Sequence, residues 1–83
     1  MDKKNLFVSN ISKCIYQELN KYFECLSPSE VTGLYDLVLK EIEAPLFNIV
    51  LDKTKGNRTH AAKCLGISRR TLQQKIKKLS INQ

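Results

Sequence analysis

The side chains best suited to bind a polyanion gather in the last third of the chain. Residues 53–83 hold nine Lys or Arg and no Asp or Glu, a net charge of +9, whereas residues 1–52 hold five Lys and eight acidic residues, a net charge of −3. Such a basic patch releases condensed counterions when it docks on phosphates, so its affinity would fall steeply with salt. A membrane surface is the other obvious polyanion, but the basic stretch has no Trp or Phe for an apolar face. The charge pattern therefore favours nucleic acid over membrane.

Local signals place this charge on a helix-turn-helix, which we predict over residues 56–79. Asn57 is a favourable N-cap for a short helix of about two turns, and Gly66 supplies the positive φ that ends it. Ser68 can cap a second helix over residues 69–78. Apolar residues recur at helical spacing and can bury toward one side: Leu65, Ile67, Leu72, Ile76 and Leu79. A solvated helical hairpin with a basic surface is the alternative.

His60 and Cys64 stand four residues apart on the first short helix, which is the spacing of two metal ligands. Structural zinc needs two more ligands, and no acidic residue follows Asp52. Catalysis has no better support, because the chain has one His, no Gly-rich phosphate loop and no carboxylate pair near that His. We therefore expect no metal site, no cofactor and no enzymatic activity.

Length and cysteine usage indicate the compartment and the size of the fold. The chain has 83 residues, enough for a single domain over 1–83, and no run approaches the roughly 20 apolar residues of a membrane span. The N-terminus has no apolar core of signal-peptide length. Three cysteines without a CxxC pair argue against a disulfide framework, so we expect Cys14, Cys25 and Cys64 to be small apolar fillers in a cytoplasmic protein.

The N-terminal half predicts two longer helices after a flexible arm over residues 1–10. The first helix begins at Ile11 and runs for about sixteen residues, because apolar residues recur at steps of three or four: Ile11, Ile15, Leu19, Phe23 and Leu26. The segment SPSE at 27–30 is a helix start signal with Pro at the first position and a possible capping box. Gly33 leaves the start of the second helix open between Pro28 and Leu34, and we expect the helix to reach about Thr54.

The second helix is apolar over more than one face, which is typical of a buried helix. A chain of 83 residues has few elements with which to bury it. We therefore expect a second copy of the chain to cover it, with residues 11–54 as dimerisation helices. Pro45 should kink or break the helix. In the alternative interpretation, Pro45 separates two shorter helices in a monomer.

The segment LYDLVLKEIEAPLFNIVLDKTKGNRTHAAKCLGISRRTLQQKIKKL resembles the Fis family, the bacterial factors for inversion stimulation, and the likeness extends over residues 11–82. The DLVL stretch, the E-x-P-L segment around Pro45, the GN helix start and the GI-x-R-x-TL turn occur in the family's order. The resemblance implies an all-α fold with four helices per chain, in which the first two intertwine as the dimer core and the last two bind DNA. It also implies a homodimeric, nucleoid-associated transcriptional regulator of the bacterial cytoplasm that bends double-stranded DNA at degenerate sites.

The resemblance also implies roles for individual residues. Asn57 and Thr59 match positions that contact the DNA backbone, and Arg69 matches the arginine that reads guanine in the major groove. His60, Ser68 and Gln73 depart from the family pattern, which has Arg, Asn and Arg at these positions, so base preference can differ. Arg70 stands where a small residue is expected and can add a phosphate contact. The predicted DNA-binding residues are Asn57, Thr59, Ser68, Arg69, Arg70, Thr71, Gln73, Lys75 and Lys78.

Three further expectations concern function. The best-known family members carry a mobile β-hairpin that activates site-specific recombinases, and we expect no such stimulation here because the arm before Ile11 has ten residues. One alternative is the DNA-binding terminus of a nitrogen-regulation type activator, although those domains follow an ATPase module and this chain begins at Met1. The other alternative is a basic module that binds an acidic protein and has no role with DNA.

Overall fold

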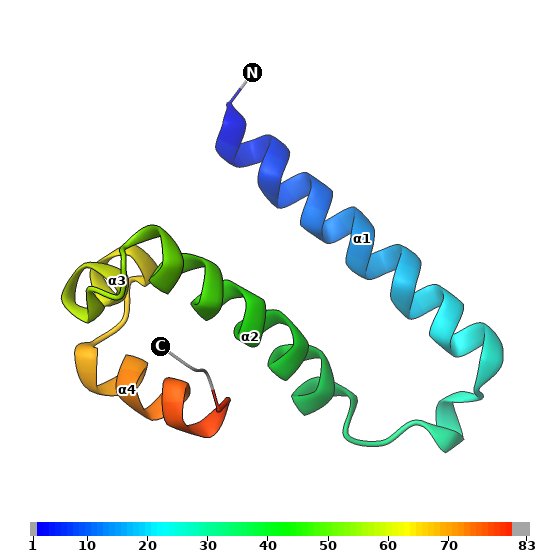
Figure 1. Ribbon diagram of the computed structural model, residues 1–83. Coiled ribbons are helices and arrows are strands. Elements are labelled where there is room, and N and C mark those ends of the chain that lie inside the picture. The colour runs from blue at the N-terminus through cyan, green and yellow to red at the C-terminus, as the bar shows by residue number, and fades with distance from the viewer. Residues whose placement is uncertain (1, 81–83) are drawn as a thin grey trace. The chain divides into compact units, whose positions relative to one another are not determined.

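The computed structural model describes residues 2–80, which are helical apart from short connections (Figure 1). Residue 1 and residues 81–83, which belong to the predicted domain over 1–83, lie outside the described residues. The all-α prediction with four helices is confirmed for the described part of the chain, in which no strand occurs. The elements are α1 (Lys3–Cys25), a 3₁₀ turn η1 (Pro28–Glu30), α2 (Leu34–Lys53), α3 (Arg58–Leu65) and α4 (Arg69–Lys78). The chain divides into two compact units, residues 1–32 and residues 33–83, which are described separately below.

Helix α1 begins eight residues earlier than the sequence pattern predicted. The expected flexible arm over residues 1–10 is wrong for residues 3–10, because these residues form the first turns of α1. Asp2 caps the helix, and its Oδ1 accepts a hydrogen bond from the Lys4 N–H at 3.0 Å. No Gly or Pro interrupts the chain from Lys3 to Cys25, so the helix continues without a break.

The SPSE segment forms a turn of its own and does not start α2. Its capping box is present, since the Ser27 N–H donates to Glu30 Oε1 at 3.4 Å and the Ser27 hydroxyl donates to the same atom at 2.8 Å. Gly33 then takes a left-handed conformation, with φ of 66°, immediately before α2. Of the two starts that the sequence left open, the structure has Leu34, because the left-handed residue cannot belong to the helix.

Helix α2 is continuous through Pro45 and ends at Lys53, one residue before the predicted end. Of the predicted kink or break at Pro45, the break is therefore wrong, and so is the alternative of two shorter helices, whereas the kink stays a prediction. Proline removes a single N–H donor, the one that would have bonded to the carbonyl of Glu41, and the rest of the helical ladder remains. The C-terminal half of α2 also packs against α3 and α4, which favours the helical conformation after Pro45 (Figure 1).

The core lies in the second unit, among the C-terminal half of α2, α3 and α4. Leu51 and Leu72 are fully buried and lie at its centre. The small side chains of Ala61 and Ala62 are buried as well, which lets α3 lie close to its neighbours. The buried core residues are Phe47, Leu51, Ala61, Ala62, Leu72 and Ile76, and Val50, Leu65, Ile67 and Leu79 pack against them. The apolar set predicted for residues 65–79 therefore does face this core.

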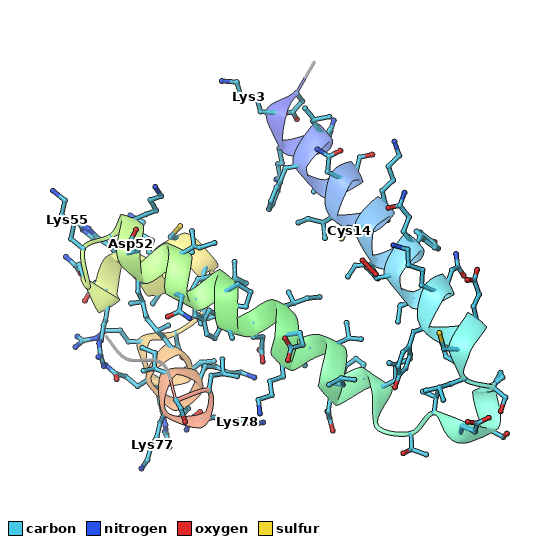
Figure 2. All side chains as sticks on the ribbon, turned by 45° about the vertical axis from the view of Figure 1, so that its right-hand side comes forward. Lys3, Cys14, Asp52, Lys55, Lys77 and Lys78 are labelled. Carbon is cyan, nitrogen blue, oxygen red and sulfur yellow. The ribbon has the colours of Figure 1, made fainter. Side chains whose placement is uncertain are left out.

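The cysteines do not fill apolar space within a single chain. Cys14 and Cys25 on α1 and Cys64 on α3 are all exposed free thiols; Cys14 is labelled in Figure 2. The prediction that they are buried fillers is wrong for the single chain. The reason is positional, because α1 has no buried residue and Cys64 lies on the side of α3 away from the core.

Candidate nucleic-acid interface

Two side-chain caps and a glycine position the helix-turn-helix. Asn57 Oδ1 accepts from the His60 N–H at 3.1 Å at the start of α3. Gly66 ends α3 in a left-handed conformation, with φ of 76°. Ser68 Oγ then accepts from the Thr71 N–H at 3.1 Å at the start of α4. The bounds of both helices are the predicted ones, because each boundary depends on a local hydrogen bond or a local φ.

The outward face of α4 is basic. Leu72 and Ile76 are buried and attach α4 to the core, and the residues on the opposite side of α4 are exposed. Figure 2 shows Lys77 extending from α4 away from α2. The exposed residues of α4 are Arg69, Arg70, Gln73, Gln74, Lys77 and Lys78. Four of these six carry a positive charge, and no acidic residue lies on α3 or α4, so the face is positive overall.

The predicted polar residues at the two helix starts lie on the surface of the same unit. Asn57 and Thr59 are exposed at the beginning of α3, and Ser68 is exposed before α4. Thr71 is half-buried, and its hydroxyl shares a hydrogen bond of 2.9 Å with the hydroxyl of Ser68. Ser68 therefore has a structural role as a cap whether or not it contacts a ligand.

Lys75 is placed differently from the other predicted cations. Its Nζ lies 2.9 Å from Oε2 of Glu43 on α2, and the two side chains are only 29% and 18% exposed, respectively. The sequence showed Lys75 as one more charge on a basic helix. In the structure its charge is directed toward α2 and is already paired there.

Arg58 is a polar residue of this surface that the sequence motifs did not single out. It occupies the first turn of α3 between the predicted residues Asn57 and Thr59, and its Nη1 donates to Gln73 Oε1 on α4 at 2.5 Å. This bond connects the start of α3 to the middle of α4. The available signal was its position between two predicted binding residues, but its partner on another helix could not be read from the sequence.

Between residues 2 and 80, no three His, Cys, Asp or Glu side chains are grouped so that they could hold a metal ion, and His60 and Cys64 gain no further ligand. None of the helices in this range is both long and apolar enough to cross a membrane.

The glycine turn between two capped helices, the shared core and the basic face of α4 define a helix-turn-helix protein. Residues 38–79 match the family model described as "Bacterial regulatory protein, Fis family". The match covers most of α2 and all of α3 and α4. The chain is 46% identical over 68 residues to the DNA-binding protein Fis of Proteus mirabilis, which covers 82% of this chain and 69% of the relative. The Fis proteins of Yersinia enterocolitica and Aeromonas hydrophila match over the same shares at 46% and 43% identity. The chain belongs to the Fis family, and none of these names denotes an enzyme.

Proposed function

We propose that this protein binds double-stranded DNA as a homodimer and acts as a nucleoid-associated transcriptional regulator. The observation that carries the proposal is the exposed positive face of α4, held on a helix-turn-helix by the buried residues Leu72 and Ile76. The names of its relatives, which are DNA-binding proteins, support it. Regulation at the nucleoid would place the protein in the bacterial cytoplasm.

In this proposal α4 enters the major groove and its first residue reads a base. Arg69 is exposed at the first position of α4, and the N-terminal residues of a recognition helix are those that reach base edges. Its guanidinium can bond to O6 and N7 of a guanine, the commonest specific contact. Asn57 and Thr59 would contact the DNA backbone from the start of α3. The supporting contacts would come from Ser68, Arg70, Thr71, Gln73 and Lys78. Lys75 is the exception, because its ammonium group is paired with Glu43.

The homodimer is supported by apolar surface that neither unit buries within itself. Helix α1 has no buried residue, although an apolar stripe runs along it from Val8 to Phe23. Helix α2 has exposed apolar residues on the surface that its own core does not use. The half-exposed apolar residues include Val8, Ile11, Tyr22 and Phe23 on α1, and Leu37, Ile42, Leu46 and Ile49 on α2. A second copy that covers both helices would remove this surface from water and give two copies of α4 for two half-sites.

Two finer properties belong to the same proposal. The protein would bend DNA at degenerate sites, as the resemblance implies. The two recognition helices of one rigid dimer must both enter the major groove of the same duplex, and the duplex would bend to allow this. It would not stimulate site-specific recombinases, since residues 3–10 form a helix and not the β-hairpin associated with that activity.

The test is a gel-shift series at increasing salt with the parent chain and two variants. We expect Arg69→Ala to reduce the preference for a specific site by about 1–3 kcal/mol, which is about 5-fold to 150-fold, because a guanine contact is lost. Lys3→Ala is the matched control, since it removes one charge at the start of α1 and should leave the preference for the specific site unchanged (Figure 2). A missing or salt-insensitive shift of the parent would favour a protein partner and remove the DNA proposal.

A further inference from the structure

Lys75 and Glu43 form an ion pair between α4 and α2 that differs from an ordinary surface pair. Their charged atoms are 2.9 Å apart, and the side chains are 29% and 18% exposed. The pair Lys21–Glu18 within α1 shows the contrast, with a separation of 3.9 Å and side chains 71% and 65% exposed. Short, partly desolvated pairs hold their geometry, whereas exposed pairs contribute little. The first pair is therefore positioned to constrain two helices.

The pairing conflicts with a phosphate contact by Lys75. The ammonium group has three donors, so a phosphate contact would either be shared with Glu43, whose carboxylate repels the phosphate, or would leave that carboxylate partly buried without its partner. An uncompensated charge in that position is costly. Lys75 consequently adds little to the counterions that binding can release.

The position of the pair shows what it can hold. The apolar contacts of α4 with the core are made by Leu72 and Ile76. Beside the pair, α2 and α4 face each other across a cavity of about 260 Å³, whose lining includes Leu39 and Leu79 as well as Glu43 and Lys75. Apolar packing alone therefore does not fill the space between the helices there. The ion pair of Lys75 with Glu43 links the two helices beside this space.

We propose that Glu43 and Lys75 are positioning residues that set the orientation of α4 on α2, and that Lys75 is not a phosphate contact. The inference rests on the proposed function, in which α2 contributes to the dimer and α4 reads DNA. Glu43 lies one turn or less from Ile42 and Leu46, which are exposed apolar residues of the proposed dimer surface. The pair thus connects the dimer surface to the reading helix, and a change in its geometry would appear twice, once in each half of the dimer. Its effect is on the distance between half-sites that the dimer accepts.

The experiment uses the full chain and four variants: Lys75→Met, Glu43→Gln, the charge reversal Glu43→Lys with Lys75→Glu, and Lys78→Met as the matched control on exposed α4 surface. Affinity is measured against salt, and also against duplexes whose two half-sites are moved apart in steps of one base pair. Loss of one phosphate-contacting cation lowers the salt slope by about 0.9. We expect that loss for Lys78→Met and a parental slope for Lys75→Met.

The spacing series measures the positioning role directly. We expect Lys75→Met and Glu43→Gln to flatten the preference for one spacing by at least about threefold, because the half-site separation is a geometric property of the dimer. The charge reversal keeps both the net charge and the ion pair, so it should keep the parental salt slope and restore the spacing preference. A merely structural role would lower stability, which circular dichroism and denaturation would show, without altering the preferred spacing of the folded protein.

The outcomes separate this inference from the proposed function. If the parent gives no salt-dependent shift, the proposed function fails and the inference falls with it. If the parent binds DNA but Lys75→Met loses as much slope as Lys78→Met, or the charge reversal fails to restore the spacing preference, only the inference is overturned. Glu43→Gln is close in shape to the parent residue, so it reports on the pair even if the reversed variant does not fold.

Discussion

The two units of the chain use the same helical periodicity with opposite results. In residues 33–80, three helices surround a core of six buried residues. In α1, which is longer than any of those three, none of the 23 residues is buried, although its apolar stripe is continuous. A helix can bury a stripe only if another surface lies against it, and within the first unit no second long helix is available. The helix-turn-helix unit therefore has its own core, whereas α1 has none within its unit.

The largest effect is expected in the core of the second unit. Leu72→Ala should lower the free energy of unfolding by about 2–5 kcal/mol, because the side chain is fully buried and the substitution leaves a cavity. Urea denaturation followed by circular dichroism measures the change. Gln74→Ala is the control on the exposed face of the same helix and should stay within about 0.5 kcal/mol of the parent. Equal effects of the two variants would contradict the assignment of the core.

A smaller effect is expected for α1, and it should depend on protein concentration. Leu19→Ala should lower the free energy of unfolding by about 1.5–3 kcal/mol where the dimer is populated, because burial of Leu19 by a second copy would be lost. Unfolding at two protein concentrations measures the free energy of unfolding, and sedimentation equilibrium measures how much dimer is present. Gln17→Ala, an exposed residue away from the stripe, should be neutral. If Leu19→Ala matches this control at every concentration, α1 is not covered by a partner.

The smallest effect tests whether the basic helix depends on its local start. Ser68→Ala removes the hydroxyl that accepts from the Thr71 N–H, so it should cost about 1 kcal/mol of unfolding free energy. Ser68→Asn keeps an acceptor at the cap and should retain most of the stability. Thermal denaturation of both variants makes the comparison. A cost shared equally by the two would show that the cap does not stabilise α4.

The accuracy of the sequence predictions follows how local each feature is. The bounds of α3 and α4 were predicted because Asn57, Gly66 and Ser68 act on neighbouring residues. The start of α1 was missed, because only one cap, at Asp2, marks it, and the apolar residues at 6–8 do not by themselves distinguish a helix from an arm. Pro45 was expected to kink or break α2, but the helix does not break, because only one hydrogen bond is lost and the turns after Pro45 pack into the core. Exposure of the cysteines could not be predicted, since it depends on which surfaces meet.

The sequence predicted which DNA-binding residues lie on the basic helix, but it did not predict where each charged side chain points. Arg69, Arg70 and Lys78 are exposed as a solvated face requires, and their contact with DNA stays a prediction. Lys75 has the same charge and helix, yet it points to Glu43. The periodicity of α4 puts Lys75 at the flank of the buried stripe, where either outcome was open. The position of α2 decides it.

By itself, the sequence determined the all-α class, the caps and turn of the helix-turn-helix, the concentration of positive charge in its last third and the family to which the chain belongs. These properties depend on residue types and on hydrogen bonds between near neighbours. Only the tertiary structure decided that Lys75 pairs with Glu43 and that Arg58 bonds to Gln73. The partners in each pair lie on different helices, and they meet because apolar packing around Leu51 and Leu72 brings those helices together.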